Sequence, residues 1–125
     1  MLGDKDVFAM VATEDIAKAK ELYGGTLGLE QLGDDEGGAM YKSGSGRIMV
    51  YESEYAGTNR ATTATWEVDD MAGVVGQLKG KGVQFEHYDM PDVKHEGEIH
   101  VWGEMKAAWF KDPDGNILGL SSMPK

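Results

Sequence analysis

The chain has 125 residues, of which 41% are hydrophobic and 27% charged, a composition typical of one globular domain with a buried core. Its 22 acidic and 12 basic residues give a net charge of −10, which argues against nucleic-acid and membrane partners because phosphates repel acidic surfaces. Cysteine is absent, which excludes disulfides and thiol nucleophiles. With neither a basic apolar leader nor a membrane-length apolar run, the sequence predicts a cytoplasmic protein.

The first half predicts a strand, a helix and a hairpin. The segment from Val7, "VFAMVATEDIAKAKELY", begins with strand character and continues with apolar residues at the spacing of one helix face. These residues are Ile16, Ala19, Leu22 and Tyr23. Asp15 is placed to cap the start of this helix. Residues 41–53, "YKSGSGRIMVYES", place turn residues between two short strand-like runs and predict a β-hairpin.

The second half repeats this order. From Thr62, "TTATWEVDDMAGVVGQL" again leads a strand into a helix, and Asp70 takes the place of Asp15. Residues 109–121, "WFKDPDGNILGLS", predict a second hairpin, and the extra length of this half is assigned to an exposed loop at 89–104. We therefore expect an α+β fold with one domain over residues 1–125. It would consist of two βαβββ modules, at about 5–57 and 60–123, whose curved mixed sheets enclose a cavity.

Three stretches resemble the marker segments of the vicinal oxygen chelate superfamily: "ATEDIAKAKELYGGTLGLE", "ATWEVDDMAGVVGQLKGKGVQFE" and "AAWFKDPDGNILGLS". This superfamily includes glyoxalase I, bleomycin-resistance proteins, fosfomycin-resistance enzymes and extradiol dioxygenases. The resemblance runs from Val7 to Ser122 and implies the paired βαβββ fold and a homodimer. It leaves the function open, because the superfamily contains isomerases, oxygenases, transferases and proteins that only bind a drug.

The resemblance also implies four cavity-facing positions for histidine or glutamate metal ligands. They fall at Phe8, Val50, Thr63 and Gly119, none of which offers an imidazole or a carboxylate. We therefore expect no cofactor, while a divalent metal held by other residues stays open.

Other acids and histidines provide the alternatives for such a metal. Glu52 and Glu67 keep the strand parity of the implied ligand positions, although solvated strand ends are the simpler interpretation. In "KHEGEIH", residues 94–100, Glu96, Glu98 and His100 would share one face of a strand, and His95 would face the opposite way. An exposed polar loop is the favoured interpretation of this segment.

Strand alternation, taken from the same positions, predicts the lining of a ligand cavity. The lining combines apolar side chains with a few hydroxyls and acids, which suits a small aromatic or amphiphilic compound. Its members are Phe8, Met10, Ile48, Val50, Glu52, Thr63, Thr65, Glu67, Ala107, Trp109, Ile117, Gly119 and Ser121. Gly119 would leave room where the carboxylate metal ligand of the family projects. Trp102 would form either a lid over the ligand or a dimer contact. The alternative is that the apolar members fill the interior.

The sequence and the resemblance are compatible with three functions from different classes. A metal-free binding protein of the bleomycin-resistance type would hold a small organic ligand, either aromatic or, given the acidic balance, cationic. A lyase, isomerase or dioxygenase would use a divalent metal through substituted ligands, or rely on Glu52, Glu67 or His100 for proton transfer. The third is a regulatory module that binds a partner. The unsuitable ligand positions favour the binding protein, and the catalytic residues of any enzyme stay unassigned.

Overall fold

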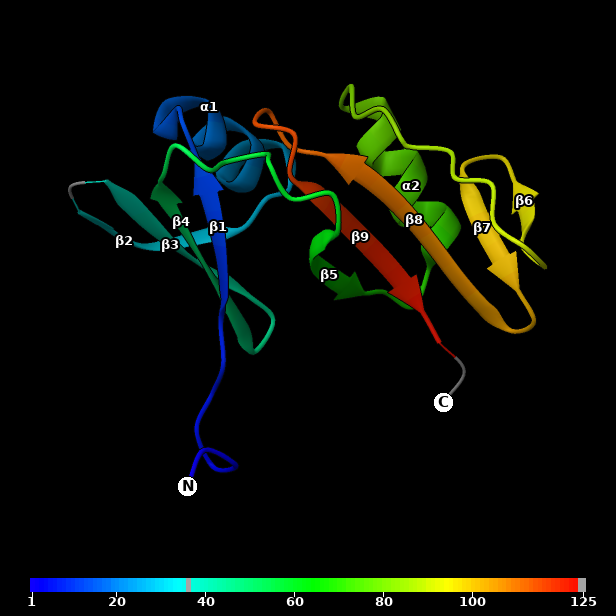
Figure 1. Cartoon of the computed structure of the whole chain (residues 1–125), viewed down its shortest axis with the longest axis horizontal. Helices are drawn as coiled ribbons and strands as arrows, with labels where there is room; N and C mark the ends of the chain where they lie inside the picture. Colours follow the sequence, from blue (N-terminus) through cyan, green and yellow to red (C-terminus); the bar gives the residue numbers. More distant parts are fainter. Residues whose placement is uncertain (36, 124–125) are drawn as a thin grey trace. The chain divides into compact units, whose positions relative to one another are not determined.

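The computed structural model describes residues 1–35 and 37–123 of the chain (Figure 1). It contains two compact units, each with one open sheet and one helical segment. The first unit comprises Met1–Asn59 and Pro113–Asn116, and the second comprises Arg60–Asp112 and the residues from Ile117 onward. Among the described residues, no helix is both long enough and apolar enough to cross a bilayer.

The first unit has a four-stranded sheet with the order β1-β4-β3-β2. Its elements are β1 (Ala9–Thr13), α1 (Ile16–Lys20), the π-helical segment η1 (Glu21–Thr26), β2 (Glu30–Asp35), β3 (Gly38–Ser43) and β4 (Gly46–Glu52). β1 and β4 are parallel, and the other neighbouring strands are antiparallel. The Asp15 carboxylate accepts a hydrogen bond from the Lys18 N–H at 3.3 Å, which confirms the predicted helix cap.

The core of the first unit lies between the helical segment and one face of the sheet. Val11, Val50 and Ala39 are direct neighbours across β1, β4 and β3, and each is at most 1% exposed. Tyr23, from η1, is fully buried with them. Because neighbouring residues in register point to the same side, this face takes every second residue of each strand.

The second unit has a five-stranded sheet with the order β5-β9-β8-β7-β6, and β5 and β9 are parallel. Its elements are β5 (Thr62–Glu67), α2 (Met71–Gly80), β6 (Lys94–Glu96), β7 (Ile99–Trp102), β8 (Met105–Lys111) and β9 (Ile117–Ser122). Asp70 caps α2 by accepting a hydrogen bond from the Gly73 N–H at 3.0 Å. α2 lies along β8 and β9 in Figure 1. The buried residues Phe110 and Leu118 pair across these two strands.

The α+β fold and both predicted hairpins are confirmed, as β3 with β4 and β8 with β9. The prediction of an exposed loop over 89–104 is wrong, because this stretch contains β6, β7 and the start of the turn into β8. Gly97 takes a φ of 62° between β6 and β7, and Ile99 is buried. Gly97 allows the chain to turn, and the burial of Ile99 holds the second strand against the core, so the segment forms a hairpin.

Candidate functional site

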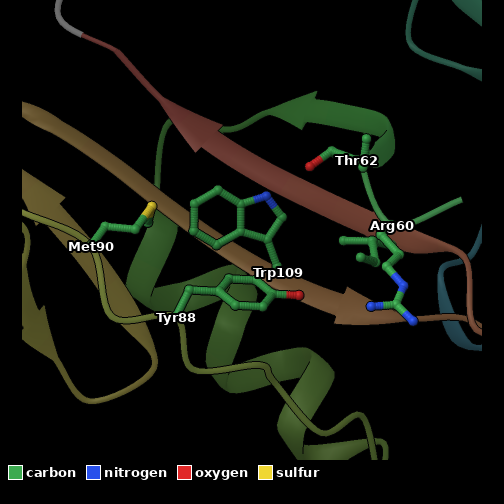
Figure 2. A pocket seen from close by; sticks show the side chains of 7 residues that line it. Arg60, Thr62, Tyr88, Met90 and Trp109 are labelled. Atoms are coloured by element: carbon green, nitrogen blue, oxygen red, sulfur yellow. The ribbon is translucent and has the colours of Figure 1, made fainter.

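A cavity of about 270 Å³ lies in the second unit (Figure 2). Its lining residues come from β8, β9, the start of β5 and the chain segments around them. They are Arg60, Ala61, Thr62, Tyr88, Met90, Trp109 and Ile117. In Figure 2 the rings of Tyr88 and Trp109 lie side by side between Met90 and Arg60. Their centroids are 5.4 Å apart with an interplanar angle of 67°, an edge-to-face contact.

The position of Trp109 depends on a glycine on the next strand. Trp109 pairs with Gly119, which pairs with Thr65 on the other side. A Cβ atom at Gly119 would lie 3.3 Å from the Trp109 ring and 3.0 Å from the Thr65 Oγ1. The space beside Gly119 is therefore filled by Trp109 and Thr65, and the expectation that it is free for a ligand group is wrong.

Tyr88 is held in place through its backbone. Just before it, the Glu86 N–H donates to the Trp109 carbonyl at 2.7 Å, so the chain runs beside β8. The Tyr88 N–H then donates to Nε2 of His100 at 3.0 Å. Burial raises the pKa of the Tyr88 hydroxyl, the charge of Glu86 adds to this shift, and Lys111 opposes it. In the part of the chain that the structure describes, this buried hydroxyl has no hydrogen-bond partner.

Three histidines gather next to this cavity. His95 on β6 lies directly opposite His100 on β7, with ring centroids 4.7 Å apart. His87 stacks on His95 at 4.1 Å, and Trp109 meets the His100 ring edge-on at 4.9 Å. The expectation that His95 and His100 face opposite ways is wrong, because the turn at Gly97 places them on two paired strands.

His100 is the buried member of this group, with 0% of its surface exposed. Burial lowers the pKa of its ring because the charged form loses hydration, and His95 and His87 add to this shift. The backbone carbonyls of Glu98 and Ala107 oppose the shift. Within residues 1–35 and 37–123, Nδ1 of His100 has no partner that meets hydrogen-bond geometry.

A carboxylate joins the exposed side of the histidine group. Oδ1 of Asp89 lies 3.0 Å from Nε2 of His87, and Nε2 of His95 lies 3.1 Å from the Tyr88 carbonyl. One ligand atom from each of His87, Asp89 and His95 lies within 4.8 Å of the other two. These three side chains therefore have the composition and spacing of a metal-binding group.

In the first unit, the predicted cavity residues divide between two faces. Ile48 and Val50 are 5% and 0% exposed and lie on the face that packs against the helical segment. Met10 pairs with Met49, so it lies on the opposite face, where it is 50% exposed. The prediction that Ile48 and Val50 share a face with Met10 is wrong. The Arg47 guanidinium stacks over the ring of Phe8 at 5.2 Å, and Glu52 lies exposed at the end of β4.

In the second unit, the predicted alternation agrees with the strand register. Thr65 pairs with Gly119 and Glu67 pairs with Ser121, so these four residues share the face of Trp109 and Ala107. Of the predicted lining, Trp109 and Ile117 contact the cavity.

Irregular backbone accounts for the other differences in the second unit. The register of β5 shifts between Thr62 and Ala64, which leaves Thr62 in the lining in place of Thr63. Trp102 pairs with Met105 at the end of β7 and is not among the described lining residues. Strand alternation missed Tyr88, Met90 and Arg60 because they lie outside named strands, where no periodic pattern applies.

Two units, each with a strand and a helical segment followed by antiparallel strands and with a parallel pair at one edge of its sheet, define a two-unit α+β protein. Residues 7–120 match the model of the Glyoxalase/Bleomycin resistance protein/Dioxygenase superfamily, and the chain belongs to this superfamily. The comparison with curated proteins found no match to the chain.

Solved structures share this fold at low sequence identity. A glyoxalase family protein from Enterococcus faecalis is 18% identical, with a TM-score of 0.74 over 97% of this chain and 99% of its own. A bleomycin-binding protein complexed with bleomycin is 21% identical, with a TM-score of 0.73 over 96% and 99%. Lactoylglutathione lyase from Agrobacterium tumefaciens is 14% identical, with a TM-score of 0.73 over 96% and 95%. At these identities the likeness shows the fold.

Proposed function

We propose that this protein binds a small planar aromatic compound in the cavity beside Trp109. The supporting observation is the pair of rings, Tyr88 and Trp109, that meet edge-to-face in an open cavity with Met90 and Ile117. Aromatic and thioether side chains favour flat apolar ligands through dispersion and ring contacts. The volume, about 270 Å³, lies just below the range for ligand pockets, about 300–1,000 Å³, and suits a compound of few rings.

The polar groups of the cavity refine the ligand class. Arg60 brings a permanent positive charge to the lining, and Thr62 brings a hydroxyl. A cationic ligand, which the net charge of −10 favours, would be repelled by Arg60. We therefore favour an aromatic ligand that carries a neutral or anionic polar group on the Arg60 side.

The residues at the implied metal-ligand positions support binding over metal-dependent catalysis. Val50 is an apolar side chain in the core of the first unit, and Phe8 carries the Arg47 guanidinium over its ring. Gly119 has no side chain, and Thr65 and Trp109 fill the space beside it. These residues do not fit a metal ion at these positions, because its ligands must be imidazole or carboxylate donors.

The alternative is a lyase, isomerase or dioxygenase with substituted metal ligands. One observation favours it, namely the group formed by His87, Asp89 and His95. For the binding protein we retain the expectation of a homodimer, which rests on the family resemblance, and of a cytoplasmic location, which rests on the composition. Light scattering on the purified chain tests the dimer.

Binding is tested with a thermal-shift screen of aromatic compounds, followed by calorimetry on any compound that stabilises the chain. Trp109→Phe keeps a ring in place, and Trp109→Ala removes it. We expect a loss of affinity of about tenfold or more for Trp109→Ala, because stacking and buried area are both lost. Trp102→Ala is the matched control, because Trp102 is partly buried in the same sheet and is not among the described lining residues. Equal affinity of Trp109→Ala and the native chain would contradict the proposal.

A further inference from the structure

We infer that His87, Asp89 and His95 form a binding site for a divalent transition-metal ion of the zinc, nickel and copper class. This site is separate from the four strand positions at which the family resemblance places metal ligands. It also goes beyond the proposed binding of an aromatic compound, since none of its three ligands is among the described cavity-lining residues.

The three ligand atoms need to move only slightly closer together to hold a metal ion. The three ligand atoms lie within 4.8 Å of one another. In a tetrahedral site with metal–ligand bonds of about 2.0–2.1 Å, ligand atoms are about 3.4 Å apart. The side chains of His87 and Asp89 are 60% and 90% exposed, so both can rotate toward the ion without disturbing the core.

The hydrogen bonds around His95 prepare its ring for a metal. Nε2 of His95 lies 3.1 Å from the Tyr88 carbonyl, which is an acceptor, so this nitrogen carries the proton. The lone pair of the neutral ring is then on Nδ1, and this is the atom that would ligate the ion. A histidine ligand that donates its other N–H to a backbone carbonyl is the usual arrangement at metal sites, because the second bond fixes the ring.

His87 and Asp89 form the mobile half of the site. Nε2 of His87 faces Oδ1 of Asp89 at 3.0 Å, a distance at which an Nε2–H group donates a hydrogen bond to the carboxylate. A metal ion would displace this proton and take both atoms as ligands. The segment that carries the pair is connected to β6 by the Tyr88 carbonyl bond to His95, so the ligands start close together.

A second contact holds the segment that carries His87 and Asp89 close to β6 and β7. His100 is fully buried, yet its Nε2 accepts the Tyr88 N–H at 3.0 Å and its Nδ1 has no partner in the described ranges. Nε2 of His100 therefore fixes the Tyr88 backbone, which lies between His87 and Asp89 in the chain, against the strand that pairs with β6. The His100 ring lies 4.7 Å from that of His95 and 6.0 Å from that of His87. We assign His100 as a positioning residue beneath the site.

The donor set selects the class of ion. Two imidazoles and one carboxylate suit zinc, nickel and copper, whereas magnesium and calcium require oxygen ligands. Three protein ligands leave at least one coordination position for water or another small ligand.

The test uses the full chain without a histidine tag. Calorimetric titration with Zn²⁺ and Ni²⁺ should give one ion per chain, and Mg²⁺ should give no signal. His87→Gln and His95→Gln should each weaken the affinity by about tenfold or more, because each removes one of three ligands. Asp89→Asn should weaken it less, because the amide oxygen remains a poor donor.

Asp92→Asn is the matched control, since it removes an equal charge from the same segment and Asp92 is not one of the three grouped residues. Asparagine also tolerates the positive φ of 62° at this position. A loss of affinity in Asp92→Asn equal to that in Asp89→Asn would overturn the inference. Absence of ion binding to the native chain, or unchanged binding to both histidine variants, would do the same.

Histidine ring resonances of the native chain give a readout that does not depend on a folded variant. Added Zn²⁺ should shift the signals of His87 and His95 most. Shifts confined to other residues would contradict the assignment. The metal titration and the thermal-shift screen of aromatic compounds are separate measurements on the native chain, so either proposal can fail without the other.

Discussion

Asn116 donates a hydrogen bond from Nδ2 to the carbonyl of Ala12 at 2.7 Å, across 104 residues of sequence. Its Oδ1 accepts a second bond from the Gly57 N–H at 3.1 Å, and the side chain is 5% exposed. The amide therefore joins β1 to two other segments of the first unit, the one after β4 and the one at 113–116. Such a buried side chain satisfies backbone groups that would otherwise lose their water without replacement.

Asn116→Ala should destabilise the first unit. It leaves a carbonyl and an N–H group without their partner, which costs about 1–3 kcal/mol for each group that stays buried. The free energy of unfolding from urea denaturation measures this loss. Gln84→Ala, an exposed amide in the second unit, is the control and should change stability by less than about 0.5 kcal/mol. Equal stabilities of the two variants would show that the Asn116 contacts contribute little.

Gly57→Ala should be more harmful than the same substitution at another left-handed glycine. Gly57 has a φ of 73°, and a Cβ there would lie 1.9 Å from the carbonyl oxygen of Asp114, so the backbone must move. Gly44 has a φ of 57°, and no described atom comes within 4 Å of its Cβ position. Gly44→Ala should cost about 1–2 kcal/mol for the left-handed backbone alone. We expect Gly57→Ala to exceed this by at least 1 kcal/mol in thermal or urea denaturation, since displaced backbone adds to the conformational cost.

Gly119→Ala should alter the environment of Trp109. The added methyl group would meet the Trp109 ring at 3.3 Å and the Thr65 hydroxyl at 3.0 Å. We expect a change in tryptophan emission and a several-fold loss of affinity for aromatic ligands, because the ring is pushed from its contact with Tyr88. The double variant Gly119→Ala/Thr65→Ala removes one of the two close contacts and should recover part of both signals. If emission and affinity match those of the native chain, Trp109 does not depend on Gly119.

The two sheets show why strand alternation agrees with the strand register in the second unit and disagrees with it in the first. β4 reads "GRIMVYE", an almost continuous apolar run in which Ile48 and Met49 look equally suited to a core. Only the register of Met10 with Met49 shows which of them packs under the helix. β9 contains Gly119 and Ser121, and these small residues mark the face that the helix does not cover.

The histidine group was missed for a different reason. The sequence alone predicts His95 and His100 on one strand, where residues five apart point to opposite sides. The structure turns at Gly97, so they become a directly opposed pair on β6 and β7. The third histidine, His87, joins them through a contact that no local pattern encodes. The available clue is the pair Gly97-Glu98 in "HEGEI", because a two-residue loop that begins with glycine is typical of a β-hairpin.

The β6–β7 turn also provides a pH-dependent contact in the second unit. Glu98 at this turn pairs with Lys79 on α2, with Nζ and Oε1 2.5 Å apart. The hydrogen bond from Lys79 is the main cause that lowers the pKa of the Glu98 carboxyl, and a backbone hydrogen bond adds to it. Because the folded state favours the charged carboxylate, the unfolded state binds more protons in the acid range.

The contribution of this pair to stability should be fully present above the ordinary glutamate pKa of 4.5 and be lost as the pH falls through the lower value of the folded state. Lys79→Met removes the donor and keeps a side chain of similar length on α2. In this variant the carboxyl signal of Glu98, followed by NMR, should titrate at higher pH than in the native chain. The loss of stability on acidification should become correspondingly less steep. The effect should be small and should shrink in high salt, because both side chains are partly exposed and ions screen the pair. An unchanged titration of Glu98 in Lys79→Met would show that the pair does not persist in solution.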